Sequence, residues 1–160
     1  MIGKEIVMKA LITGSFDPPT LGHLDIIKRA CAMFDSVTVC IFVNSNKNYT
    51  FDTQTRKSMI EAMCEGIDNL SVDFTDTTVP DYYERNGFDV IVKGVRNSRD
   101  VEYETELLEL YKSQNAKVET VFLPGTPQYR WISSSAAREI MRYNADLTPI
   151  LHENVIKLIK

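Results

Sequence analysis

Residues 9–23 read Lys-Ala-Leu-Ile-Thr-Gly-Ser-Phe-Asp-Pro-Pro-Thr-Leu-Gly-His, and this stretch decides the fold. Residues 9–13 form a short apolar run that predicts a strand, which Gly14 ends. The residues that follow carry apolar side chains at helical spacing, at Leu24, Ile27, Ala30, Cys31 and Phe34. The stretch therefore predicts a strand that turns tightly into a helix over residues 21–34, with a hydroxyl, two prolines and an imidazole in the connection.

The strand-then-helix pattern recurs along the chain. We expect further strands at 36–43, 70–74 and 118–123, and one whose centre is residues 90–92. Helices are expected after Asp52, which offers an N-cap, and at 80–86, 101–113, 133–143 (with a serine cap) and 149–159. Short apolar strands separated by helices predict a parallel sheet covered on both faces. The predicted fold class is doubly wound α/β with five parallel strands. Because no linker or repeat interrupts the sequence, residues 1–160 are expected to form a single domain.

The composition and the distribution of charged and apolar residues argue against a nucleic-acid-binding protein and against a membrane protein. The 160 residues are 44% hydrophobic and 25% charged, with a formal net charge of −4 and no cluster of basic residues, which argues against nucleic acid as a partner. No signal peptide or apolar run of membrane-spanning length is evident, so a cytoplasmic protein with no membrane partner is expected. Cys31, Cys40 and Cys64 lie among apolar neighbours without a CxxC pair, which predicts buried free thiols.

The residues that are candidates for binding or catalysis follow the predicted strands. In doubly wound sheets, ligands bind beyond the carboxyl ends of the strands. The first connection has neither GxGxxG nor GxxxxGK[ST], but it places His23 at the opening of a helix, whose free amides favour an anion. Three serines, Ser133 to Ser135, open another predicted helix, and their hydroxyls and amides are expected to point one way, toward nucleotide phosphates. The cations of residues 93–100 are expected in a loop after the fourth strand, beside Gly94.

Several motifs together resemble one family. Thr20-Leu21-Gly22-His23 is similar to the T-x-G-H form of the first signature of the α/β nucleotidyltransferase superfamily, and residues 132–135 (Ile-Ser-Ser-Ser) are similar to its second. Their order with Lys47, residues 93–96 (Lys-Gly-Val-Arg) and residues 102–104 (Glu-Tyr-Glu) resembles the phosphopantetheine adenylyltransferase family over nearly the whole chain. The chain has Ser15 and Lys93 where that family commonly has Thr and Arg, which preserves the hydroxyl and the charge.

The resemblance implies a Rossmann-like nucleotidyltransferase fold and the transfer of the adenylyl group of ATP to 4′-phosphopantetheine, giving dephospho-coenzyme A and pyrophosphate. It implies His23 as a transition-state stabiliser with Lys47 and Lys93 as further catalytic residues, and an acceptor site made of Ser15, Lys47, Val79 and Lys93. The implied ATP site comprises Ser15, Phe16, Thr20, His23, Gly94, Val95, Arg96, Glu104, Tyr129, Arg130, Trp131, Ile132, Ser133, Ser134 and Ser135. It also implies a homohexamer, and dephospho-coenzyme A or coenzyme A as product-like ligands.

The expected chemistry needs no general base. A phosphate monoester is largely ionised at neutral pH, because its second pKa lies near 6, so direct in-line transfer without a covalent enzyme intermediate is expected. Mg²⁺ is expected on the ATP phosphates rather than in a protein cage, because no dense carboxylate cluster is visible. Asp17 is the nearest acid, but its position in the loop is equally typical of a residue that stabilises a turn. Three alternatives remain open: a sister enzyme that uses nicotinamide mononucleotide or glycerol phosphate, a catalytically silent nucleotide-binding regulator, and a flavodoxin-like electron carrier.

Overall fold

Five parallel strands form one sheet in the computed structural model, which describes residues 7–159. They are β1 (Lys9–Gly14), β2 (Ser36–Phe42), β3 (Leu70–Thr75), β4 (Val90–Val95) and β5 (Thr120–Pro124). Their spatial order is β3-β2-β1-β4-β5, and every neighbouring pair is parallel. The order reverses between β1 and β4, which is where a doubly wound sheet opens a crevice for a ligand. The predicted five-stranded parallel sheet is confirmed.

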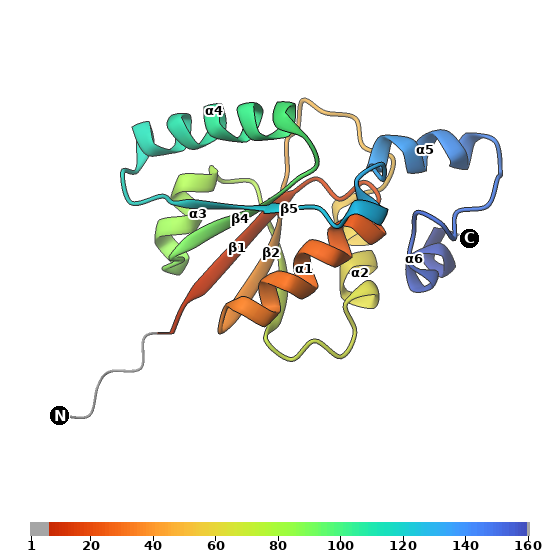
Figure 1. The fold of residues 1–160 in the computed structure, drawn as a ribbon, viewed down its shortest axis with the longest axis horizontal. Helices are drawn as coiled ribbons and strands as arrows, with labels where there is room; N and C mark the ends of the chain where they lie inside the picture. Colours follow the sequence, from red (N-terminus) through yellow and green to blue (C-terminus); the bar gives the residue numbers. More distant parts are fainter. Residues whose placement is uncertain (1–6, 160) are drawn as a thin grey trace.

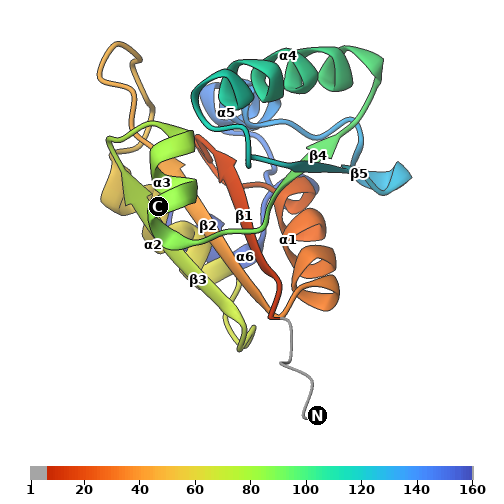
Figure 2. The same ribbon diagram turned by 90° about the vertical axis from the view of Figure 1, so that its left-hand side faces the viewer.

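Helices cover both faces of this sheet (Figures 1 and 2). They are α1 (Leu21–Met33), α2 (Thr53–Met63), α3 (Val79–Asn86), α4 (Ser98–Gln114), α5 (Ser134–Arg142) and α6 (Glu153–Ile159), with a 3₁₀ turn, η1, at Pro127–Tyr129. In Figure 1, α4 lies on one side of the sheet, with α1, α2 and α6 on the other. None of the helices within residues 7–159 is long and apolar enough to cross a membrane.

The side chains of each strand point alternately to the two faces of the sheet, and they pack into two separate cores. In β1, Ala10 and Ile12 pack into the core beneath α1, α2 and α6, while Leu11 packs into the core beneath α3 and α4. Successive side chains of a strand point to opposite faces, so a strand covered on both sides must be apolar throughout. This is why residues 9–13 read as a continuous apolar run rather than as an alternating one.

Side-chain caps set the starts of the helices. Thr20 caps α1, with its hydroxyl accepting from the backbone N–H of His23, and Asp52 caps α2 through Thr55 N. Ser133 caps α5, accepting from Ala136 N at 3.0 Å. The capping roles predicted for Asp52 and for a serine at residue 133 are confirmed. They were readable because a cap joins residues only three positions apart.

Three of the predicted boundaries are wrong by three residues or more. Strand β4 runs through Val95, so residues 93–95 do not lie in the loop where they were predicted, because Lys93, Gly94 and Val95 pair with β5 at Phe122, Leu123 and Pro124. Lys93 therefore projects from a rigid strand and not from a loop. Helix α4 begins at Ser98, capped by Asn97, and so includes part of the charged stretch. Helix α6 begins at Glu153, and Pro149 lies in a preceding turn.

Gly94 permits the close approach of α1 to the sheet. A Cβ atom built there would lie 2.7 Å from Cγ1 of Ile26, well inside van der Waals contact. A larger residue at this position would push α1, and with it the N-terminal turn that carries His23, away from β4. The glycine of the Lys-Gly-Val-Arg motif thus has a packing role, whichever ligand the site binds.

The three cysteines are free thiols. Cys40 and Cys64 are buried, and burial raises the pKa of each to about 12. Cys31 is only half-buried, so the prediction of buried thiols is confirmed at two of its three positions.

Candidate functional site

Two pockets lie side by side at the carboxyl edge of the sheet, and they share a wall. The first has a volume of about 370 Å³ and the second about 420 Å³. The residues that line both are Thr13 from β1, Lys93 from β4, and Tyr103 and Glu104 from α4. The pockets therefore meet at the strand-order reversal between β1 and β4, where a doubly wound sheet is expected to bind ligands.

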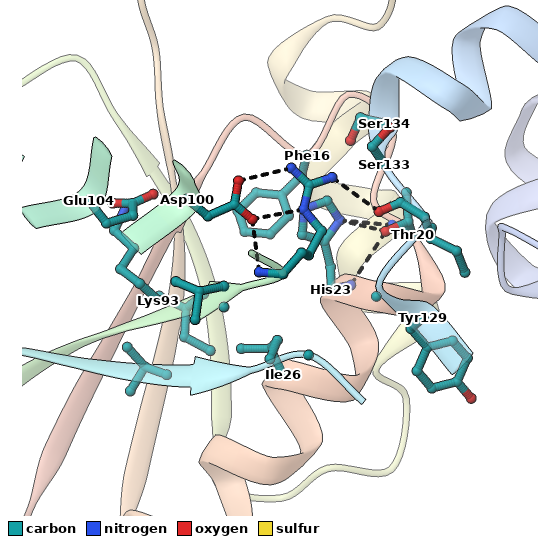
Figure 3. Close-up of a pocket in the computed structure, with 18 of the residues that line it drawn as sticks. Phe16, Thr20, His23, Ile26, Lys93, Asp100, Glu104, Tyr129, Ser133 and Ser134 are labelled. Carbon is teal, nitrogen blue, oxygen red and sulfur yellow. Dashed lines mark hydrogen bonds and ion pairs between the residues drawn. The ribbon is translucent and has the colours of Figure 1, made fainter. Parts of the chain in front are cut away.

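Most of the residues that the sequence analysis assigned to the ATP site line the first pocket. It is lined by residues of the first loop and α1, of β4 and α4, and of the turn before α5: Phe16, Thr20, His23, Gly94, Val95, Arg96, Glu104, Tyr129, Ile132, Ser133 and Ser134 (Figure 3). These residues lie up to 118 positions apart in the sequence, between Phe16 and Ser134, so only the fold brings them together.

The residues that the sequence analysis assigned to the acceptor site line the second pocket. Ser15, Lys47, Val79 and Lys93 all line it. The remaining lining residues include Asn44 and Tyr49 from the β2–α2 loop, and Leu107 and Tyr111 from α4. Two of the four assigned residues are lysines, so the pocket offers cationic nitrogen atoms to an anion.

The orientation of His23 is fixed by the start of its own helix. Its Nδ1 atom accepts the backbone N–H of Thr20 at 3.0 Å and lies 3.1 Å from the Thr20 hydroxyl, as Figure 3 shows. A neutral imidazole with Nδ1 as an acceptor carries its proton on Nε2. The ring of Phe16 packs edge-on against the imidazole, with 4.9 Å between the ring centroids. His23 is thus held as a neutral hydrogen-bond donor in the wall of the first pocket.

Burial is the main cause that lowers the pKa of His23, to about 4, and the positive charge of Arg96 lowers it further. We predict that the imidazole of the ligand-free protein stays neutral from pH 8 down to about 5. The pKa is depressed from its ordinary 6.5, so the unfolded chain binds more protons between those two values. His23 therefore makes the protein less stable as the pH falls from about 6.5 toward 4.

An NMR titration of the imidazole signals measures this directly, with the His23→Gln variant identifying which signals belong to His23. A midpoint near 6.5 would contradict the prediction. Replacing Arg96 by Gln is expected to raise the midpoint, because a nearby positive charge is removed.

Phe16 has an uncommon backbone conformation, with φ at 49°. A bulky residue rarely takes this left-handed conformation, and the surrounding structure has to hold it there. The buried ring fills the space above Gly14, where a Cβ would lie 2.9 Å from the Phe16 ring. Gly14 and Phe16 thus form one packed unit that supports the imidazole of His23.

Arg96 links α4 to the turn before α5. Its Nε donates to Asp100 Oδ2 at 3.0 Å, and its Nη1 lies 3.5 Å from the carbonyl oxygen of Ile132. Burial alone would raise the pKa of Asp100, but hydrogen bonds from the Arg96 side chain and backbone, together with its charge, hold that pKa below its usual range. The carboxylate neutralises part of the charge that Arg96 offers to the first pocket.

Lys93 forms an ion pair with Glu104 in the shared wall. Lys93 Nζ lies 3.1 Å from Glu104 Oε2, and both side chains are largely shielded from solvent. Figure 3 shows the two side chains together at one side of the pocket. The ammonium group can therefore face an anion in either pocket while Glu104 holds it in place.

The three serine hydroxyls before and within α5 diverge, so the prediction that they point one way is wrong. Ser133 caps the helix, Ser134 Oγ donates to the carbonyl oxygen of Pro18 at 2.9 Å, and Ser135 Oγ accepts from Arg138 Nη2 at 3.1 Å. Successive residues at a helix start are rotated by about 100° from one another, which separates their side chains. Ser133 and Ser134 line the first pocket, but their hydroxyls are bonded in different directions and do not form a row.

Four assigned residues do not line the first pocket. Ser15 lines only the second pocket, and Arg130 donates from Nε to the carbonyl oxygen of Gly125. Trp131 is 59% exposed and lines neither pocket, and Ser135 is exposed and lines neither pocket either. The assignment of these side chains to ATP stays a prediction that the pocket geometry does not support.

Sequence reasoning missed several residues of the site. Asp100, Gly125 and Ile26 line the first pocket, and Asn44 and Tyr49 line the second. Asp100 had a detectable signal, since it lies four positions after Arg96, the spacing of an ion pair on one helical turn. The others carry no local signal, because the sheet brings them to the site from separate segments.

The carboxylates near the pockets are already engaged. Asp100 binds Arg96, Glu104 pairs with Lys93, and both oxygens of Asp17 accept backbone N–H groups, from Thr50 and Phe51. No group of three or more His, Cys, Asp or Glu side chains suited to a metal ion occurs in the part of the chain that the structure describes. The residues present therefore do not fit a protein-caged metal.

Comparison with known proteins identifies the family. A model of the cytidylyltransferase-like family matches residues 11–140. The phosphopantetheine adenylyltransferase of Oenococcus oeni is 41% identical over 155 residues, covering 96% of this chain and 98% of that protein. The one from Staphylococcus carnosus is 39% identical over 152 residues, covering 95% and 94%. The chain belongs to the phosphopantetheine adenylyltransferase family. The resemblance found in the motifs is confirmed.

A solved structure supports the fold. The nicotinic acid mononucleotide adenylyltransferase of Plasmodium falciparum, complexed with NaAD, has a TM-score of 0.69 to this chain and covers 96% of it, with 95% of its own length matched. At 16% identity this likeness shows the Rossmann-like nucleotidyltransferase fold alone.

Proposed function

We propose that this chain transfers the adenylyl group of ATP to 4′-phosphopantetheine, giving dephospho-coenzyme A and pyrophosphate in coenzyme A biosynthesis. The observation that supports the proposal most is the shared wall of the two pockets at Lys93 and Glu104. A transferase must bring a donor and an acceptor into contact, and two adjoining sites with a common cation meet this need. Names of relatives at about 40% identity agree with this activity.

ATP occupies the first pocket in this proposal. The N-terminal ends of α1 and α5 offer backbone amides to its phosphates, and Arg96 adds a positive charge. Phe16, Thr20, Gly94, Val95, Glu104, Tyr129 and Ile132 line the remainder of the site, and Ser133 and Ser134 close it. The phosphate of 4′-phosphopantetheine lies in the second pocket with Lys47, Lys93 and Ser15, and Val79 faces the pantetheine arm.

The reaction follows from this arrangement. An oxygen of the acceptor phosphate attacks the α-phosphorus of ATP in line with the departing pyrophosphate, so one P–O bond forms as another breaks. The nucleophile is already ionised and needs no base, and His23 is neutral with its proton on Nε2. We assign His23 as the donor that stabilises charge on the α-phosphate, and Lys93 as the cation shared by both substrates.

Mg²⁺ is proposed to arrive with ATP as part of the substrate. The carboxylates lining the pockets are paired with Arg96 and Lys93, which leaves phosphate oxygens and water as its ligands. The expected result is that activity vanishes with EDTA and returns with added Mg²⁺. In the same titrations, the metal alone is expected to leave the melting temperature of the ligand-free protein unchanged.

Pyrophosphate release, measured with and without 4′-phosphopantetheine and with a mass measurement of the nucleotide product, tests the function. Release that depends on this acceptor and yields dephospho-coenzyme A is expected. Faster release with nicotinamide mononucleotide or glycerol phosphate would favour a sister enzyme. ATP binding without turnover would favour a regulator, and a yellow purified protein with flavin absorbance would favour an electron carrier.

The serine turn gives a prediction that separates binding from stability. Ser133→Ala is expected to lower the free energy of unfolding by about 1 kcal/mol, because it removes the cap of α5. Ser134→Ala is expected to weaken ATP and pyrophosphate binding, because its hydroxyl ties the turn to Pro18 beside the first pocket. Ser135→Ala serves as the matched control with little effect on binding. Calorimetry that finds ATP binding unchanged in Ser134→Ala would contradict the assignment.

Assembly and compartment are part of the proposal. We expect a homohexamer, as the family resemblance implies, and a cytoplasmic location consistent with three free thiols. Sedimentation velocity of the purified full chain is expected to give a single species of about six chains. A monomer at micromolar concentration would contradict the hexamer.

A further inference from the structure

Asp17 joins two loops that carry different parts of the site. Its side chain is only 5% exposed, and both carboxylate oxygens are in use. Oδ2 accepts the backbone N–H of Thr50 at 2.8 Å, and Oδ1 accepts that of Phe51 at 2.9 Å. The acceptors lie in the first loop, and the donors end the β2–α2 loop, which projects from the carboxyl edge of the sheet (Figure 2) and carries Lys47.

Arg56 makes a second connection between the same loops. It is 1% exposed, the largest of the fully buried side chains, and lies on the first turn of α2. Its Nη1 donates to the carbonyl oxygen of Ser15 at 2.7 Å, and its guanidinium carbon lies 4.0 Å from the ring centroid of Tyr49. Its Nε is buried without a partner. Burying an incompletely satisfied cation costs free energy, so these contacts to the two loops offset a real penalty.

We propose that Asp17 and Arg56 are positioning residues that set the separation of Ser15 and Lys47, and so shape the site for the acceptor phosphate. Neither residue lines either pocket, but each holds a segment that does: Ser15, Lys47 and Tyr49 line the second. Asp17 therefore holds a loop rather than a metal ion, and Arg56 acts through the carbonyl of Ser15 and the ring of Tyr49. The inference rests on the proposed function, since it assigns the second pocket to 4′-phosphopantetheine.

The structure also explains why loss of the Asp17 contacts is expected to leave the ATP site unchanged. The first loop is fastened independently to α5, where Ser134 donates to the carbonyl oxygen of Pro18 and Arg138 Nη1 donates to that of Asp17 at 2.7 Å. Loss of the Asp17 carboxylate frees the β2–α2 loop while these two bonds still hold the first loop. The effect is therefore expected in the acceptor site and not in the ATP site.

Asp17→Asn is the decisive variant, because an amide offers one acceptor oxygen where two N–H groups need one each. We expect the KM for 4′-phosphopantetheine to rise tenfold or more, with the KM for ATP within about twofold of wild type. Hydrogen exchange at the amides of Thr50 and Phe51 is expected to accelerate at least tenfold. Asp52→Asn is the matched control, since it makes the same change at the cap of α2, one residue after Phe51, and Asn still caps a helix.

Arg56 supplies a second comparison, independent of whether Asp17→Asn folds. Arg56→Met removes the bond to Ser15, and Arg56→Lys keeps a cation and one donor. We expect the KM for 4′-phosphopantetheine to rise in Arg56→Met and to be partly restored in Arg56→Lys. A purely structural role would lower the melting temperature of both variants and change the KM values of ATP and acceptor alike.

The exchange measurement needs no substrate, so it separates this inference from the proposed function. A wild-type protein inactive toward 4′-phosphopantetheine would contradict the function, while faster exchange at Thr50 and Phe51 in Asp17→Asn would still support the tether. Unchanged exchange in Asp17→Asn, or equal increases in the two KM values, would overturn the positioning role.

Discussion

His23→Ala is expected to lower turnover roughly 10²- to 10³-fold, the scale seen when one oxyanion donor is removed, with little change in the KM for 4′-phosphopantetheine. The imidazole is neutral, and its Nδ1 is occupied by the Thr20 N–H, so Nε2–H is the group left to donate into the pocket. Charge grows on the α-phosphate only as the transition state forms. Loss of the donor therefore affects turnover more than binding.

The same imidazole completes the cap of α1, so the measurement needs a variant that keeps this role. His23 occupies the position where a capping box usually has Glu or Gln. A Gln there has an amide oxygen to accept from Thr20 N and an amide N–H to donate to a phosphate. We expect His23→Gln to match wild type in melting temperature and to retain more turnover than His23→Ala. Wild-type turnover in His23→Ala, with only weaker binding, would remove His23 from catalysis.

Lys93→Ala is expected to raise the KM for 4′-phosphopantetheine about 10- to 100-fold, the range for losing one hydrogen bond to a charged group. The KM for ATP is expected to rise less, because Arg96 and the helix amides still face the triphosphate. The substitution also leaves Glu104 without its cation beside two polyanions. Steady-state kinetics with each substrate varied in turn measures both constants.

Two further variants control this experiment. Lys93→Arg keeps the charge and is expected to retain much of the activity, and Lys93→Ala combined with Glu104→Gln is expected to regain part of the lost affinity by removing the unpaired carboxylate. Lys117→Ala, at an exposed site remote from the pockets, is expected to leave both constants unchanged. Equal increases for the two substrates in Lys93→Ala would refute the acceptor assignment.

The fold could be predicted because its signals are local. Residues 9–13 and 36–43 read as buried strands from their apolar runs, and Asp52 and Ser133 read as caps from side chains three positions from the amides they bind. The end of β4 could not be predicted. Lys93 and Gly94 look like loop residues, and only pairing with β5 and packing on Ile26 keep them in the strand.

The site could be predicted where the residues of one short sequence motif lie next to one another in the lining of the pocket. Thr20 and His23 form one helical turn, and Lys93 to Arg96 follow one strand into the pocket. The stretch from Arg130 to Ser135 was harder, because a turn entering a helix directs successive side chains differently. The positioning roles of Asp17 and Arg56 were missed, since these side chains act on the backbone of segments 33 to 41 positions away, a relation that no short pattern in the sequence encodes.

The stereochemical course at phosphorus tests the central claim, which is direct transfer between two adjoining pockets. One diastereomer of adenosine 5′-O-(1-thiotriphosphate) is converted with 4′-phosphopantetheine, and the configuration of the thiophosphate product is determined. A single in-line attack by the acceptor phosphate inverts the configuration at the α-phosphorus. Retention would require two displacements through an adenylylated protein, and would contradict transfer in one step across the wall that Lys93 and Glu104 form.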